Sequence, residues 1–176
     1  MIKTTPFEMV FIIRVTMIFE SGVYQLDIDV ERTQHFYANE DFEFCTCAGC
    51  RNFSKAYHLF PEAVQQFFRK FGIDIGKPAE ITAYNSSDGN LTYYDGFYHI
   101  CGIILAGKDP WLQVGERAYQ LDEQYALKVT NDFSVFFTEK CALVDKEFPT
   151  PVIQMEIQCN IPWVLEEANP YFYPGP

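Results

Sequence analysis

Apolar residues recur at every second position over long stretches of this chain, and this alternation limits the fold more than any other feature of the sequence. From Phe7 to Phe19 every odd-numbered position is apolar, and the pattern resumes from Val23 to Val30 after a turn at residues 20–22. Because side chains alternate between the two faces of a β-strand, a period of two predicts strands. We expect a hairpin with one solvated face at the start of the chain.

The second half of the chain, from Pro78 onward, is predicted to be mostly strand. Aromatic residues make up 17% of the sequence, and their flat side chains pack well on a pleated sheet. Turns are expected at residues 85–90 and at Asp95-Gly96, and residues 107–124 show no period and are expected to form a long loop. The expected strands are Glu80–Tyr84, Leu91–Tyr94, Phe97–Leu105, Leu127–Val129, Phe133–Phe137, Cys141–Val144 and Val152–Ile161.

Helices are expected between these two groups of strands. Asp29 is placed to cap a short helix over residues 31–37. A second helix is expected to start at Asn52 or Ser54 and to run to about residue 59. Pro61 suits the first position of a third helix, which carries an apolar stripe and ends at Gly72.

These elements predict an α+β fold, with an antiparallel or mixed sheet and two or three short helices packed on it. A chain of 176 residues suits a single domain spanning residues 1–176. Residues 1–16 could be an extension ahead of Met17. Residues 168–176 form a tail rich in proline and aromatic residues, which either lies on its own domain or docks on a partner.

Three thiols fall within six residues, at Cys45, Cys47 and Cys50. A tight turn with small residues buries little apolar area, so metal binding explains the cluster better than core packing does. Zinc prefers four ligands at tetrahedral angles, and a tight turn can aim several sulfurs at one point. Gly49 suits such a turn because glycine tolerates a positive φ. We therefore predict a structural zinc site.

The fourth zinc ligand has to come from elsewhere in the chain. If residues 50–58 are helical, His58 lies about 12 Å along the axis, which is too far. His99 and Cys101 lie two positions apart on an expected strand and share a face, so His99 is the first candidate and Cys101 the second. The alternative for His99 is a half-buried histidine bonded to the backbone. Arg51 and Asn52 could hydrogen-bond the sulfurs.

A redox function is the alternative interpretation of the same turn. Cys47 and Cys50 form a C-x-x-C pair, and such a pair at the start of a helix has an acidified first thiol. The βαβ pattern of a thioredoxin-like fold is absent, and Cys45 would be a third competing thiol. Cys141 and Cys159 occupy apolar positions and are expected to act as buried hydrophobic residues.

The formal net charge of -11 argues against binding to nucleic acid or to an anionic membrane, because both need Lys and Arg to neutralise phosphates. Arg14 interrupts the apolar start of the chain and no small-residue cleavage site follows, so a cytoplasmic location is expected. No G-x-S-x-G, H-E-x-x-H, phosphate-binding loop or dinucleotide-binding motif is present. The sequence favours a non-enzymatic protein and specifies neither a partner nor an oligomeric state.

Several short segments together resemble an uncharacterised family of small bacterial proteins with no assigned activity. They are the Cys45–Phe53 turn, Gly72-Ile73-Asp74, residues 77–80, Gly96–His99 and Ile161–Leu165. The resemblance covers about residues 17–167 and implies that members start near Met17 and use the cysteine turn together with His99. The first expectation for function is a zinc-containing binding or interaction module. A thiol redox enzyme and a metal-free structural protein are the alternatives.

Overall fold

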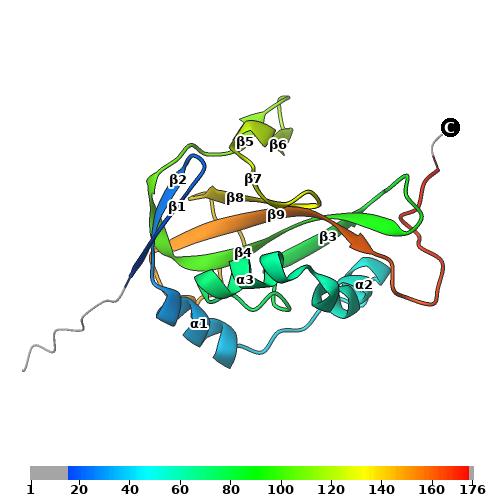
Figure 1. The fold of residues 1–176 in the computed structure, drawn as a ribbon, viewed down its shortest axis with the longest axis horizontal. Helices are drawn as coiled ribbons and strands as arrows, with labels where there is room; N and C mark the ends of the chain where they lie inside the picture. Colours follow the sequence, from blue (N-terminus) through cyan, green and yellow to red (C-terminus); the bar gives the residue numbers. More distant parts are fainter. Residues whose placement is uncertain (1–15, 175–176) are drawn as a thin grey trace, which may run out of the picture.

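A computed structural model describes residues 16–174 of the chain, and its centre is an antiparallel sheet of seven strands (Figure 1). The strand order is β1-β2-β4-β9-β8-β7, and β3 pairs with β4 beside this series. The predicted α+β class is therefore confirmed. The strands are β1 (Met17–Ser21), β2 (Tyr24–Ile28), β3 (Glu80–Tyr84), β4 (Leu91–Ala106), β7 (Leu127–Thr130), β8 (Phe133–Thr138) and β9 (Val152–Pro162).

The structure describes only the last part of the first expected strand. β1 covers Met17–Ser21 and pairs with β2 in a hairpin, as predicted. Residues 1–15 lie outside the described residues. The part of this strand from Phe7 to Val15 and the possible extension over residues 1–16 therefore stay predictions.

The longest strand, β4, organises the sheet. It runs for 16 residues, with β9 along one side and with β3 and then β2 along the other. The turn predicted at Asp95-Gly96 is wrong, because both residues continue β4 and pair on both sides. A Cβ atom at Gly96 would lie 2.6 Å from the Glu80 carbonyl oxygen. The glycine therefore permits a close approach of β3 and does not mark a turn.

Helix α1 (Val30–Asn39) begins as predicted, and its side chains bond to the part of β4 that lies between β2 and β3. The Asp29 carboxylate caps it by accepting a hydrogen bond from the Arg32 backbone nitrogen at 3.1 Å. The Tyr37 hydroxyl bonds both the nitrogen and the carbonyl oxygen of His99, each at 3.1 Å. The Thr33 hydroxyl accepts a bond from the Cys101 nitrogen at 2.9 Å. Side chains of α1 thus satisfy main-chain groups that would otherwise be buried without partners.

Two further helices lie against the same side of the sheet (Figure 1). They are α2 (Ala48–Ala56), followed by a 3-10 turn at Tyr57–Leu59, and α3 (Glu62–Phe71). The ring of Phe68 on α3 packs against Tyr98 of β4 at 4.9 Å between centroids. Gly72 ends α3 with a φ of 73°, which confirms the predicted stop. Helix α2 begins four residues earlier than the predicted Asn52, because Cys47 serves as its N-cap.

The opposite side of the sheet is not covered by α1, α2 or α3 (Figure 1). Residues 107–124, predicted to be a loop, contain the hairpin of β5 (Trp111–Gln113) and β6 (Tyr119–Leu121), which lies away from the helices in Figure 1. The strand predicted at Cys141–Val144 is wrong, because this segment is irregular. The Ala142 nitrogen donates to the side-chain oxygen of Gln154 at 2.7 Å and so does not join a ladder.

Candidate metal centre

The three clustered thiols surround the start of α2. Cys45 precedes the helix, Cys47 is its N-cap and Cys50 lies in its first turn. The Cys45 sulfur lies 3.1 Å from that of Cys47 and 3.0 Å from that of Cys50, and all three sulfurs lie within 4.8 Å of one another. Cys45 and Cys47 are exposed, while Cys50 is buried. The three sulfurs are close enough to bind one metal ion.

Gly49 allows the start of α2 to sit directly on the sheet. A Cβ atom there would lie 2.7 Å from the Cβ of Ala83 on β3 and 3.0 Å from the Tyr171 hydroxyl. Its backbone is helical, so the positive φ expected at this position is wrong. The glycine is required by the close approach of helix and strand, which brings the Cys50 sulfur to 3.8 Å from the Ile81 carbonyl oxygen.

The two thiols of the C-x-x-C pair differ in acidity. Burial raises the pKa of Cys47, but hydrogen bonds from the backbone nitrogens of Cys50 and Gly49 and from the neighbouring thiols outweigh it, and the pKa is lowered overall. Burial raises the pKa of Cys50 strongly, and the adjacent thiols raise it further. Cys47 is therefore the thiol that ionises first, and its sulfur is also the exposed one of the pair.

Arg51 and Asn52 do not bond the sulfurs, contrary to expectation. The Arg51 guanidinium bonds the Thr46 carbonyl oxygen and pairs with Glu167. Asn52 is fully buried. Its side-chain nitrogen donates to the Tyr94 hydroxyl and to the Pro162 carbonyl oxygen, both at 3.1 Å, and its oxygen accepts from the Val164 nitrogen at 2.8 Å. Asn52 thereby joins α2 to the sheet.

Replacing Asn52 with alanine is expected to lower the free energy of unfolding by on the order of 2–3 kcal/mol, because it leaves buried polar partners unsatisfied. Urea unfolding followed by circular dichroism measures the change. Asn39→Ala is the matched control, since Asn39 is exposed and bonds only to His35 one turn away among the described residues. The same loss in both variants would contradict the role assigned to Asn52.

His99 lies apart from the three thiols. It is 3% exposed, and its Nε2 atom lies 2.9 Å from the Ala142 carbonyl oxygen. Burial lowers the pKa of its ring. Tyr98, the residue before it, faces the helices, so His99 points to the opposite side of the sheet. The structure thus brings together Cys45, Cys47 and Cys50 but not His99, whose surroundings match those of a backbone-bonded strand histidine.

Residues of the C-terminal tail contribute to the site, and no motif in the sequence indicates this contribution. The backbone nitrogen of Ser86 donates to the Tyr171 carbonyl oxygen at 2.8 Å, so the tail lies on its own domain. The Tyr171 hydroxyl lies close enough to the Cys47 side chain to interact with it. Burial raises the pKa of this hydroxyl, and the charge of Cys47 raises it further. The aromatic residues of the tail indicated that it packs against something, but the sequence did not show that Tyr171 packs at the thiol cluster.

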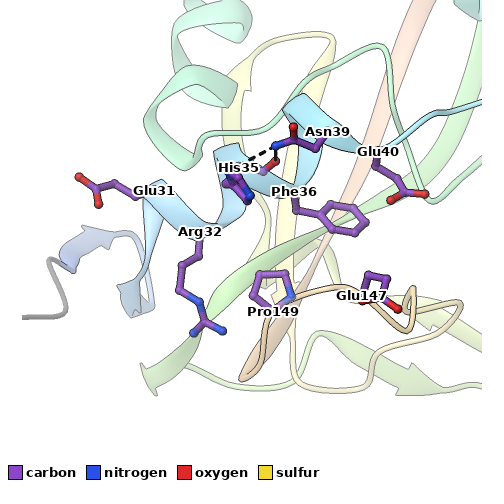
Figure 2. Close-up of a pocket in the computed structure, with 8 residues that line it drawn as sticks. All are labelled: Glu31, Arg32, His35, Phe36, Asn39, Glu40, Glu147 and Pro149. Carbon is purple, nitrogen blue, oxygen red and sulfur yellow. Dashed lines mark hydrogen bonds between the residues drawn. The ribbon is translucent and has the colours of Figure 1, made fainter. Parts of the chain in front are cut away.

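A cavity of about 530 Å³ lies elsewhere, between α1 and the segment around Pro149 (Figure 2). Its charged residues are mixed in sign, with Arg32 among several glutamates. The contacts drawn in Figure 2 join Asn39 to His35 and involve no other lining residue. We find no arrangement of catalytic groups in it.

The chain has no match among protein-family models, curated proteins or solved structures. The resemblance to a bacterial family therefore stays a prediction. Within residues 16–174, the helices fall short of the length and apolar character needed to cross a bilayer. The geometry of the three thiols is thus the basis for a functional conclusion.

Proposed function

We propose that Cys45, Cys47 and Cys50 bind a zinc ion that stabilises the start of α2, in a cytoplasmic protein that acts as a binding module. The observation that carries this proposal is the convergence of three sulfurs within 4.8 Å of one another. Thiolates are soft ligands that favour zinc over magnesium or calcium. Binding would ionise the thiols, including Cys50, whose pKa is otherwise raised.

The described residues supply three zinc ligands and leave the fourth position open, which supports a role in binding a partner. Among residues 16–174, no additional Cys, His, Asp or Glu joins the group of three thiols. Two of the three cysteines are exposed, so the remaining position is reachable from solvent. A side chain of a partner protein would complete the tetrahedron there, which links metal binding to partner binding.

Metal analysis tests the zinc proposal. Protein purified without added zinc is expected to contain close to one equivalent of zinc. Cys47→Ser is expected to lose it, because two sulfurs do not suffice for a stable structural site. Cys141→Ser is the matched control, since Cys141 lies outside the group, and His99→Ala should also retain the metal. Less than a tenth of an equivalent in the wild type, with freely titrating thiols, would overturn the proposal.

A thiol redox function is the second candidate, and the position of Cys47 favours it. Cys47 is exposed at the N-terminus of α2 and its pKa is lowered, while Cys50 is buried one turn away. This is the arrangement of an attacking and a resolving thiol. A redox function requires a reversible Cys47–Cys50 disulfide and a thiol pKa below the usual ~8.5. An unreactive Cys47 in metal-free protein would rule it out.

A further inference from the structure

A second cavity, of about 340 Å³, lies on the side of the sheet opposite α1, α2 and α3. Three paired strands, β3, β4 and β9, form its floor, and their register shows which side chains lie next to one another there. Phe97 on β4 pairs with Glu80 on β3 and with Glu156 on β9, and two positions away Asp95 pairs with Thr82 and Gln158. Residues two apart on a strand share a face, so these two rows lie side by side on one surface. Carboxyl groups from three strands are thereby gathered over one area.

Glu156 is the most buried of these carboxyl groups, at 5% exposure. Its Oε1 atom accepts a hydrogen bond from the Gln154 side chain at 2.6 Å, and the Trp111 indole donates another. Asp95 accepts bonds from Tyr93 and Gln158, yet its buried Oδ1 atom has no hydrogen-bond partner among the described residues. Such an atom is costly to bury unless something else bonds to it.

In the described part of the chain, the one lysine that lines this cavity is already engaged. Lys140 lines the cavity, but its ammonium group pairs with Asp109, outside the cavity. The carboxyl groups of Glu80, Asp95 and Glu156 therefore face the cavity without a lysine or arginine of their own among the described residues. The cavity is complementary to a cation.

Aromatic side chains form part of the cavity lining. Tyr84, Phe97 and Trp111 line it together with the carboxyl groups. Aromatic faces attract cations that carry an apolar body, and the volume falls near the lower end of the range of about 300–1,000 Å³ for small-molecule sites. A bare divalent metal fits less well, because among residues 16–174 the one group of closely spaced ligand atoms is the thiol cluster.

We propose that this cavity binds a small organic ammonium ion. The carboxylates of Glu156 and Asp95 face the ammonium group, and the rings of Trp111, Phe97 and Tyr84 face its apolar body. Asp95 and Glu156 are diagonal neighbours on adjacent strands, about 7 Å apart at that spacing. An ammonium group with several N-H donors spans this separation and bonds the free Oδ1 atom of Asp95. The site is separate from the thiol cluster and does not depend on metal binding.

Binding of three matched probes tests the proposal. Phenethylammonium, 2-phenylethanol and 3-phenylpropionate share the ring and differ in charge. Trp163→Phe leaves Trp111 as the sole tryptophan, because the chain contains two, so its fluorescence reports on the cavity. At pH 8 we expect phenethylammonium to bind at least about tenfold more tightly than the alcohol, and the anion to bind most weakly.

Variants then assign the preference to the cavity. Glu156→Gln keeps the side-chain oxygen that accepts from Gln154 and removes the charge, and it is expected to reduce the cation preference to about threefold or less. Asp95→Asn is a second variant with the same expectation, and a thermal melt confirms folding of each. Glu147→Gln removes one carboxylate from the cavity of Figure 2 and should leave the preference unchanged.

Three results would overturn the proposal. The first is the absence of saturable binding of phenethylammonium at millimolar concentration. The second is equal affinity for the cation and the alcohol in the wild type. The third is a preference that survives in folded Glu156→Gln and Asp95→Asn proteins, or one that Glu147→Gln removes as effectively.

Discussion

Replacing Cys50 with serine is expected to abolish the stabilisation of the folded protein by zinc. A ligand that binds only the native state stabilises it by about 4 kcal/mol when its free concentration is about a thousand times the dissociation constant. Cys50 is the buried member of the cluster and joins α2 to β3 through Ile81. Urea unfolding with added zinc and with a chelator measures the difference for each protein.

The matched control for this experiment is Cys141→Ser. Cys141 is half-buried and its sulfur lies 3.7 Å from the Val152 carbonyl oxygen, away from the cluster. It should keep the full difference between zinc and chelator, while Cys50→Ser should show none. A wild-type protein whose unfolding free energy is the same in zinc and in chelator would contradict the structural role of the metal.

Replacing Glu156 with glutamine is expected to stabilise the protein at pH 8 by on the order of 3 kcal/mol and to leave its stability nearly unchanged at pH 4. Burial raises the pKa of Glu156 from 4.5 to about 7. Between these values the native state holds a proton that the unfolded state has lost, so stability falls as the pH rises. The destabilisation caused by burying the ionised Glu156 carboxylate is absent below pH 4.5 and complete above pH 7. Glutamine has no charge to bury.

Denaturant unfolding of both proteins between pH 4 and pH 8 checks this prediction. Asp95, whose pKa is also raised by burial, and His99, whose pKa is lowered by burial, titrate in both proteins. The difference between wild type and Glu156→Gln therefore isolates Glu156. Glu147→Gln, at an exposed position, should give a difference near zero throughout. A gain from Glu156→Gln that is the same at pH 4 and pH 8 would show that charge burial is not its cause.

Local signals predicted several element boundaries correctly. The Asp29 cap, the Gly72 stop and the bounds of β3 at Glu80–Tyr84 follow from residues within a few positions of each boundary. Capping and alternation are short-range effects, so the neighbouring sequence suffices to predict them. Gly96 shows where this fails, because its small size serves a contact with β3 and the sequence around it reads as a turn.

The same distinction between local signals and long-range contacts applies to the candidate metal site. Three thiols within six residues must lie close together in any compact turn, and the structure places their sulfurs within 4.8 Å. The position of His99 depends on which face of β4 the helices cover. Alternation shows that Tyr98 and His99 point in opposite directions, but it does not show that α2 lies on the Tyr98 side.

By itself, the sequence determined the α+β class, the presence of two or three short helices and the clustering of Cys45, Cys47 and Cys50, because each depends on residues that are near one another in the chain. Tertiary structure alone decided that His99 faces away from the thiols, that Asn52 joins α2 to the sheet, and that Glu156 is buried beside Trp111 in a cavity. The physical reason is that strand order and helix placement arise from contacts between distant segments, which alternation and spacing do not encode.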